Sequence, residues 1–309
     1  MAPPTLLILA HKLPAVSGFA CATQAAPSGD TVLESPQLLV PGPAPMEPDV
    51  VRAARFLAEG HARLAPFEPV PQTFAPRTVQ QAFAAQDALQ AIMVDTLGPV
   101  AGWKIALTTR VMQQMVGWHE PVPGAVFART VHRSPAQVHA ERFTHLGIEC
   151  ELAVRLGTDL PAHGAPYDRD AVAAAVAAVM PAFELVDDRR VDYSCFAANI
   201  LSFIADNAWN AGVVLGAPVT DWHTLDLASL HGVLSVNGAP EGEGHGRDVM
   251  GHPLDALAWL ANALAARGRE LAAGMLIMTG SIVATRFVAA SDEAVFRLGA
   301  LGEVHASIC

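Results

Sequence analysis

The chain has 309 residues, of which 52% are hydrophobic, and its formal net charge is −11. An acidic balance with scattered basic residues argues against nucleic acid or an anionic membrane surface as the main partner. No apolar run approaches the roughly 18 uninterrupted residues of a membrane helix, so no membrane span is predicted. The length allows one large domain or two small ones, and the composition indicates a protein that acts on small molecules.

Four cysteines, Cys21, Cys150, Cys195 and Cys309, are widely spaced and form no Cys-x-x-Cys pair. This spacing argues against both a disulfide framework and a zinc site. A reducing cytoplasm is therefore the predicted location.

The first 45 residues differ in composition from the rest, because Pro, Ala, Ser and Gly dominate them. A short apolar patch at residues 6–10 precedes His11 and Lys12, whereas a signal peptide needs positive charge before a longer apolar stretch. We therefore expect residues 1–45 to be an unstructured extension, with Met46 as an alternative start of translation.

Two helices are predicted in residues 46–100, which we interpret as an N-terminal helical segment. Residues 50–64 carry apolar side chains at helical spacing after Pro48 and Asp49. The second helix covers residues 78–97, with Thr78 as its N-cap and Gly98 after its last turn.

From residue 101 onward, short apolar runs alternate with turns that contain Gly or Pro. The predicted strands are residues 102–107, 148–156, 182–186, 213–216, 275–279 and 304–308. Two helices interrupt them, at residues 168–180 with Asp168 as N-cap, and at residues 253–267. This mixture, without a strict βαβ rhythm, predicts one α+β domain over residues 101–309.

Two glutamates share one face of the predicted strand at residues 148–156. Apolar side chains alternate at positions 148, 150, 152 and 154, which leaves Glu149 and Glu151 together on the other face. Unpaired carboxylates so close would repel each other, and a divalent cation such as magnesium, manganese or calcium would relieve that repulsion. The alternative is the solvated outer face of an antiparallel strand.

Two more charged residues lie inside apolar runs. Glu184 is at the centre of residues 181–186, where an isolated charge is costly, so it needs a cation or a salt bridge to Arg189 or Arg190. The only other lysine is Lys12, yet Lys104 lies in the strand at residues 102–107. Acid–base catalysis or substrate anchoring would explain a buried lysine, and chance retention would explain it too.

Three further segments are candidates for the site. Asp206 follows an apolar, helix-like stretch and Ser281 ends a predicted strand, but both fit ordinary turn chemistry. The Gly-x-Gly-x-Gly run at residues 242–246 follows no strand-to-helix phosphate site, so we expect a flexible loop over a pocket instead of a dinucleotide fold. The surrounding residues 237–253 would then shape the binding of a substrate's tail.

Five motifs in chain order resemble the 2-keto-4-pentenoate hydratase and 4-oxalocrotonate decarboxylase family, within the fumarylacetoacetate hydrolase superfamily. They are Gly-Trp-Lys-Ile-Ala-Leu-Thr (102–108), Ile-Glu-Cys-Glu-Leu-Ala (148–153), Pro-Ala-Phe-Glu-Leu-Val-Asp-Asp-Arg (181–189), Ala-Asp-Asn-Ala (205–208) and Leu-Ile-Met-Thr-Gly-Ser (276–281). The likeness runs from about Met46 to the C-terminus.

The resemblance implies a fumarylacetoacetase C-terminal-like fold, which is a curved mixed β-sheet roll with flanking helices. It implies a Mg²⁺ or Mn²⁺ site made of Glu149, Glu151 and Glu184, beside an active-site lysine at Lys104. Asp206 and Ser281 fall in matching motifs as further catalytic candidates. It also implies a cytoplasmic homo-oligomer of aromatic-compound breakdown, in some cases associated with another enzyme of its pathway.

The chain departs from the family pattern at two positions. Hydratases of the family carry acids where this chain has approximately Val122 and Ala128. The resemblance favours a metal-dependent lyase that adds water to a 2-hydroxy-2,4-dienoate or 2-oxo-enoate, with a Lys104 pKa lowered toward neutrality. A 2-oxo acid decarboxylase or a C–C hydrolase is the alternative, because decarboxylation needs only an electron sink at the 2-oxo group. A non-catalytic homologue that binds a partner enzyme is a third reading.

Overall fold

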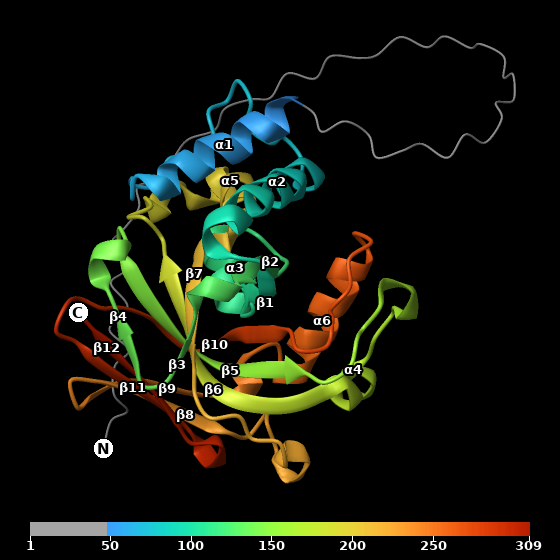
Figure 1. Cartoon of the computed structure of the whole chain (residues 1–309), viewed down its shortest axis with the longest axis vertical. Helices are drawn as coiled ribbons and strands as arrows, with labels where there is room; N and C mark the ends of the chain where they lie inside the picture. The colour runs from blue at the N-terminus through green and yellow to red at the C-terminus, as the bar shows by residue number, and fades with distance from the viewer. Residues whose placement is uncertain (1–47) are drawn as a thin grey trace, which may run out of the picture. The chain divides into compact units, whose positions relative to one another are not determined.

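Two β-sheets with helices around them make up the fold (Figure 1). The computed structural model describes residues 48–309, which belong to one compact unit. Its helices are α1 (Pro48–Ala62), α2 (Val79–Leu97), α3 (Arg110–Val116), α4 (Arg169–Ala175), α5 (Ile200–Ala205) and α6 (Pro253–Ala265). The predicted extension, residues 1–45, lies outside the described residues.

The described strands form a mixed α+β architecture, as predicted. The seven-stranded sheet has the order β2-β1-β10-β5-β6-β7-β3, and the five-stranded sheet has the order β4-β12-β11-β8-β9. The strands of the first sheet are β1 (Val100–Ala106), β2 (Val122–Phe127), β3 (Val131–Arg133), β5 (Leu146–Leu156), β6 (Val176–Asp187), β7 (Asn210–Leu215) and β10 (Leu276–Phe287). Those of the second are β4 (Ala136–Val138), β8 (His231–Val236), β9 (Ala239–His245), β11 (Glu293–Leu298) and β12 (Glu303–Ile308).

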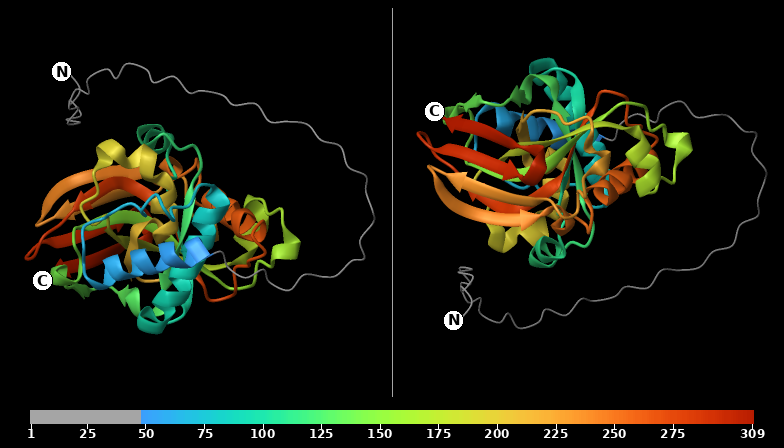
Figure 2. Two further views of the ribbon diagram at one scale, coloured as in Figure 1. Left: turned by 90° about the horizontal axis from the view of Figure 1, so that it is seen from above. Right: turned by 90° about the horizontal axis from the view of Figure 1, so that it is seen from below.

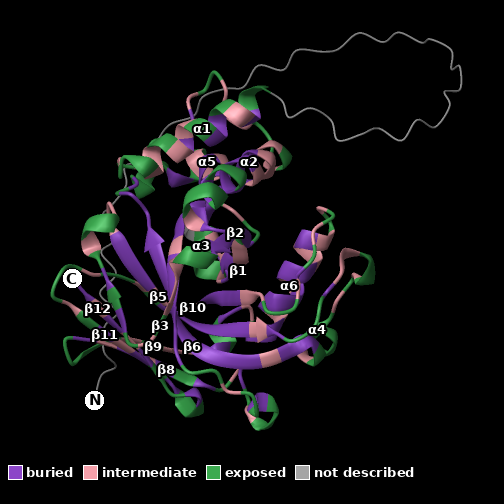
Figure 3. Cartoon of the chain, in the orientation of Figure 1, coloured by how far each residue is buried: buried purple, intermediate pink, exposed green. Residues whose placement is uncertain are grey.

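The main core lies between the two sheets. Phe183 of β6 and Phe296 of β11 are fully buried, with ring centroids 6.3 Å apart. Figure 3 shows buried residues along the long strands and exposed ones on the outer helix faces. Burial of apolar side chains between the sheets is the main contribution to stability here. Because this core is closely packed, β5 and β6 hold their side chains in fixed positions.

Helices α1, α2 and α5 gather on one side of the seven-stranded sheet (Figure 1), and Figure 2 shows the same group from above. The sequence predictions for α1, α2 and α6 are confirmed within two or three residues at each end. Thr78 caps α2 as predicted, because its hydroxyl accepts a hydrogen bond from the Gln81 N–H at 3.1 Å.

The prediction of a helix over residues 168–180 is wrong in its second half. Asp168 does cap α4, accepting a hydrogen bond from the Ala171 N–H at 2.9 Å. The helix ends at Ala175, and β6 begins at Val176. Pairing with β5 from Leu156 to Leu146 decides the outcome, because a buried antiparallel ladder outweighs the helix propensity of the alanines.

Two further predictions change in the region after residue 237. The glycine run at residues 242–246 is largely β9, paired with β8, and is therefore not a flexible loop. The strand predicted to end near Ser281 continues as β10 to Phe287, with irregular register between Met278 and Arg286. These irregularities let polar residues such as Ser281 sit inside a strand.

Among the described residues, none of the helices combines the length and apolar character needed to cross a membrane.

Candidate active site

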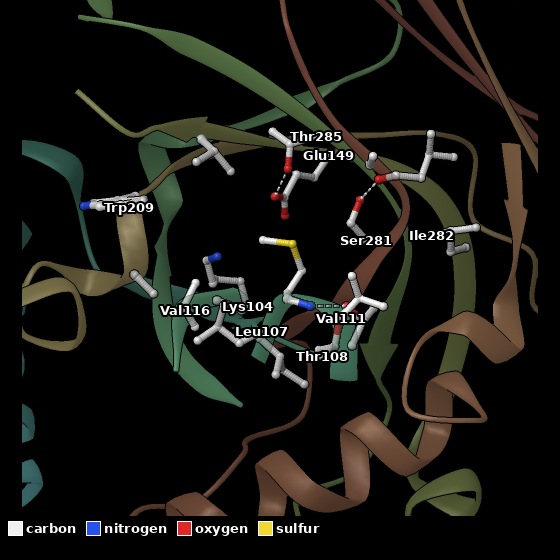
Figure 4. A pocket seen from close by; sticks show the side chains of 18 of the residues that line it. Lys104, Leu107, Thr108, Val111, Val116, Glu149, Trp209, Ser281, Ile282 and Thr285 are labelled. Atoms are coloured by element: carbon white, nitrogen blue, oxygen red, sulfur yellow. Dashed lines mark hydrogen bonds between the residues drawn. The ribbon is translucent and has the colours of Figure 1, made fainter. Parts of the chain in front are cut away.

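A cavity of about 310 Å³ lies where β1 and β10 face helices α3 and α5 and the segments that flank α5 (Figure 4). Its volume is at the low end of the range for small-ligand sites. Lys104 comes from β1, Glu149 from β5, and Ser281 with Thr285 from β10. Elements far apart in sequence thus place three of the predicted site residues, Lys104, Glu149 and Ser281, around one space.

The three predicted glutamates come together beside this cavity. β5 and β6 pair antiparallel with Glu149 opposite Glu184, and Glu151 is two residues further along β5. One carboxylate oxygen from each lies within 4.8 Å of the others. Glu151 and Glu184 are fully buried and Glu149 is half-buried, so the alternative of a solvated strand face is wrong.

Each carboxylate is held by one neutral donor. Glu149 accepts a hydrogen bond from the Thr285 hydroxyl at 2.5 Å, and Glu151 accepts one from the Gly280 N–H at 2.8 Å. Glu184 accepts one from the Asn210 side-chain amide at 3.0 Å. Such partners fix the orientation of metal-ligating carboxylates.

The other oxygens of Glu151 and Glu184 are what make the cluster suitable for a cation. Glu151 Oε1 and Glu184 Oε2 are buried and have no hydrogen-bond partner among the described residues. A buried carboxylate oxygen without a partner is strongly unfavourable. Three converging carboxylates are hard ligands, so this donor set fits Mg²⁺ or Mn²⁺.

The pKa values of the buried acids reflect the same crowding. Burial raises the pKa of Glu151 well above its ordinary value, and the negative charges of Glu184 and Glu149 raise it further. Burial also raises the pKa of Glu184 to about 7, against the opposing effect of the Lys104 cation. Without a cation, burial therefore favours the protonated forms of Glu151 and Glu184.

Lys104 is the positive charge of this cluster. Its Nζ lies 3.0 Å from Glu184 Oε1, and its side chain is 2% exposed. Burial lowers its pKa, but the charges of Glu184 and Glu149 outweigh burial and raise the pKa above its ordinary value. The expected lowering of the Lys104 pKa toward neutrality is therefore absent when the carboxylates hold no cation. Lys104 is then an ammonium at neutral pH.

Ser281 lines the cavity opposite the aromatic side chain of Trp209 (Figure 4). Its hydroxyl donates to the Val283 carbonyl at 2.6 Å and accepts from the Cys150 N–H at 3.2 Å. Both bonds lie within the sheet, so the hydroxyl shapes the irregular part of β10. Its catalytic role stays a prediction.

Asp206 is not among the residues that line the cavity. Its fully buried carboxylate forms an ion pair with Arg189 and a 2.7 Å contact with His61 Nε2. These contacts tie α1 to the end of α5 and to the turn after β6. The structure therefore places Asp206 in a supporting network, away from the atoms that face the cavity.

Sequence reasoning did not identify Thr285, Gly280 or Asn210. Thr285 lies in the part of β10 beyond the predicted strand, and Asn210 starts β7 with no local pattern to mark it. Gly280 belongs to the motif at residues 276–281, and its contribution is a backbone N–H that donates a hydrogen bond to Glu151. A ligand's hydrogen-bond partner is set by tertiary structure, which leaves little signal in local sequence.

The chain is similar in sequence to known proteins. The family model described as "Fumarylacetoacetate (FAA) hydrolase C-terminal" matches residues 105–309. A 4-oxalocrotonate decarboxylase of Pseudomonas putida is 34% identical over 207 residues, which are 67% of this chain and 76% of that protein. A 2-hydroxyhexa-2,4-dienoate hydratase of Comamonas testosteroni is 37% identical over 196 residues, which are 63% of this chain and 72% of that protein.

A solved structure shows the same fold. The 4-oxalocrotonate decarboxylase from Pseudomonas putida G7, complexed with magnesium and adipate, superposes with a TM-score of 0.77 at 29% identity. The match covers 84% of this chain and 97% of that one. The expected fumarylacetoacetase-like fold is thereby confirmed.

Proposed function

The chain belongs to the fumarylacetoacetate hydrolase family, and from this premise we propose that it is a metal-dependent carbon–oxygen lyase. Its substrate would be a 2-hydroxy-2,4-dienoic acid or the corresponding 2-oxo-enoic acid. The reaction would add water to the double bond remote from the carboxylate. The proposal rests on the buried glutamate cluster, in which two oxygens have no hydrogen-bond partner among the described residues. The cluster lies next to Lys104 and is open to the cavity through Glu149.

We propose that Glu149, Glu151 and Glu184 hold Mg²⁺ or Mn²⁺. Thr285, Gly280 and Asn210 fix one oxygen of each carboxylate, which leaves the other oxygens for the ion. The bound ion would supply a Lewis acid that favours enolisation of a 2-oxo acid. Because only Glu149 of the three lines the cavity, the substrate's carboxylate and 2-oxygen would lie on that side.

Lys104 would hold or move a proton at the 2-oxygen end of the substrate. Its Nζ is beside Glu184 and its side chain lines the cavity, so it can reach both the cluster and a bound ligand. The predominantly apolar wall would exclude bulk water and strengthen the charge interactions inside. Ser281 would contribute by shaping the wall, and Asp206 by supporting α1 and α5.

Decarboxylation of a 2-oxo acid is the second candidate. Neither Val122 nor Ala128, where the family's hydratases carry acids, lines the cavity. Val122 is buried at the start of β2, and Ala128 is exposed just after its end. The chain thus offers no carboxyl group at either position to assist water addition. Decarboxylation needs only the 2-oxo group of the substrate as an electron sink.

The proposed function also includes a cellular location, an oligomeric state and a domain organisation. We propose a cytoplasmic homo-oligomer that works in aromatic-compound breakdown, in which residues 46–100 form a helical segment beside a catalytic domain of residues 101–309. Association with a neighbouring enzyme of the pathway would fit the same role. Size measurement of the full chain by light scattering tests the oligomer directly.

The test of the reaction is product analysis with the Mg²⁺-loaded protein and a 2-hydroxy-2,4-dienoate. Gain of one water in the product by mass spectrometry supports hydration, and release of CO₂ from a 2-oxo-enedioate supports decarboxylation. Lys104→Met should lower kcat by about 10²- to 10⁴-fold while Mg²⁺ stays bound. Unchanged turnover in Lys104→Met would contradict the role of the lysine, and no turnover of any such acid would contradict the proposed function.

A further inference from the structure

We infer that the cavity selects a substrate whose tail is uncharged and apolar, alkyl or aryl, and discriminates against a second carboxylate. The inference rests on the proposed function, because it concerns the part of the same substrate that extends away from the glutamate cluster.

The charged residues that line the cavity disfavour a second carboxylate on the substrate. Among the lining residues in the described part of the chain, the only cationic side chain is Lys104. It is already paired with Glu184 at 3.0 Å. The other charged lining residues are the acids Glu149 and Asp248. With Glu149 assigned to the metal, the remaining charged lining residue is Asp248. A carboxylate at the far end of a substrate would therefore find no free cation on this wall and would be repelled by Asp248.

A cluster of aromatic side chains in the cavity lining favours an apolar tail. Three aromatic side chains that line the cavity pack edge-to-face against one another: Phe196, Phe203 and Trp209. Their ring centroids are 4.7 Å apart for Phe203 and Trp209, and 5.3 Å apart for Phe196 and Trp209. Val111 and Val116 of α3 add apolar side chains to the lining of the cavity (Figure 4). Such a surface gains from contact with an apolar group and offers nothing to a charged one.

The position of Trp209 is fixed by the backbone, so the wall is preformed. Asn207, Ala208 and Trp209 have successive φ values of 55°, 47° and 59°, which is uncommon for residues other than glycine. The Asn207 side chain holds this turn by accepting from the Ala125 N–H at 2.7 Å and donating to the Ala125 carbonyl at 2.9 Å. Because Ala125 follows Gly124, the strand partner of Lys104, the turn ties the aromatic wall to the strand pair that carries the lysine.

The first experiment measures binding without requiring turnover. Saturated 2-oxohexanoate and 2-oxoadipate have the same carbon count and differ in a methyl against a carboxylate at the distal end. Calorimetry with the Mg²⁺-loaded full chain should show at least about tenfold tighter binding of 2-oxohexanoate. Equal or tighter binding of 2-oxoadipate would overturn the inference. Preference for 2-oxohexanoate without turnover of unsaturated 2-oxo acids would support the inference while contradicting the proposed reaction.

The second experiment reverses the preference with one added charge. Val111 lines the cavity and is 74% exposed, so Val111→Arg can be accommodated without burying a cation. It should raise the affinity for 2-oxoadipate relative to 2-oxohexanoate by about tenfold. The matched control is Val94→Arg on α2, which is also exposed but does not line the cavity and should leave the ratio unchanged. An unchanged ratio in Val111→Arg, or an equal shift in Val94→Arg, would overturn the placement of the tail.

Discussion

The oxygens Glu151 Oε1 and Glu184 Oε2 are the clearest functional mark at the scale of single residues. Each is buried without a partner among the described residues, and each belongs to an acid whose pKa is raised by burial. An unsatisfied buried polar group costs about 1–3 kcal/mol, and more if it is charged. Stability alone gives no reason to keep such groups, whereas a bound cation would satisfy both.

Gly280 offers a precise test of how the cluster is oriented. Its φ of +117° disfavours any side chain, and a Cβ there would clash with the Thr108 hydroxyl. Gly280→Ala should therefore displace the N–H that binds Glu151 and weaken Mg²⁺ binding by about tenfold to 100-fold. Calorimetric titration with Mg²⁺ measures the change.

The control for this substitution is Gly274→Ala. Gly274 has a comparable φ of +85°, but an added Cβ would have nothing within 4 Å. It should lose stability from the backbone strain alone and keep its Mg²⁺ affinity. Equal loss of affinity in the two variants would show that Gly280 acts only through general stability.

At the scale of elements, the Asp206 network explains how helices far from the cavity support it. Asp206 binds Arg189, which follows β6, and His61, which is near the end of α1. Its neighbour Asn207 accepts a hydrogen bond from Gln90 of α2 at 3.0 Å and bonds to Ala125 of β2. Two adjacent residues thus join α1, α2 and β2 to the turn that carries Trp209.

Asp206→Asn should destabilise the protein strongly without removing its metal site. The substitution leaves the buried Arg189 charge without its partner, and breaking a buried ion pair costs about 3–5 kcal/mol. Denaturant unfolding measures this loss, and Mg²⁺ titration of the folded variant should give an affinity close to that of the unchanged protein.

Asp49→Asn is the matched control for Asp206→Asn. Asp49 pairs with Arg52 on the surface of α1, where both side chains are more than half exposed. Exposed pairs contribute little, so the loss should stay below about 1 kcal/mol. Similar losses in the two variants would contradict the supporting role of the Asp206 network.

The elements also show how far local sequence could predict the structure. Helices α2 and α6 were predictable because their caps and apolar spacing are local features. The strand character of Val176–Met180 was not, because it depends on pairing with β5, far away in sequence. The same holds in the site: alternation placed Glu149 and Glu151 on one face, but nothing local marked Thr285 or Asn210 as their neighbours.

At the scale of the whole molecule, the raised pKa of Glu184 predicts a pH-dependent stability. The pKa is about 7 in the folded chain against an ordinary value of 4.5, so the folded state keeps a proton that the unfolded state has released. In the absence of metal, the free energy of unfolding should therefore fall as the pH rises from about 4.5 to about 7. Chemical denaturation at a series of pH values measures this slope.

Two comparisons make this pH effect specific to the cluster. Glu184→Gln should reduce the slope, because its amide does not titrate. Saturating Mg²⁺ should also remove the slope, since the ion competes with protons, and its apparent affinity should rise with pH over the same range. A slope unaffected by both changes would assign the pH dependence to other groups.

The paired strands β5 and β6 bring three glutamates together, and we propose that these hold a catalytic cation. The most direct measurement is Mg²⁺ binding and turnover of a 2-hydroxy-2,4-dienoate by Glu151→Gln, with Glu141→Gln as the matched control at a surface position. Glu151→Gln should lose both metal binding and turnover, while Glu141→Gln should keep both. Undiminished metal binding and turnover in Glu151→Gln would contradict the proposal.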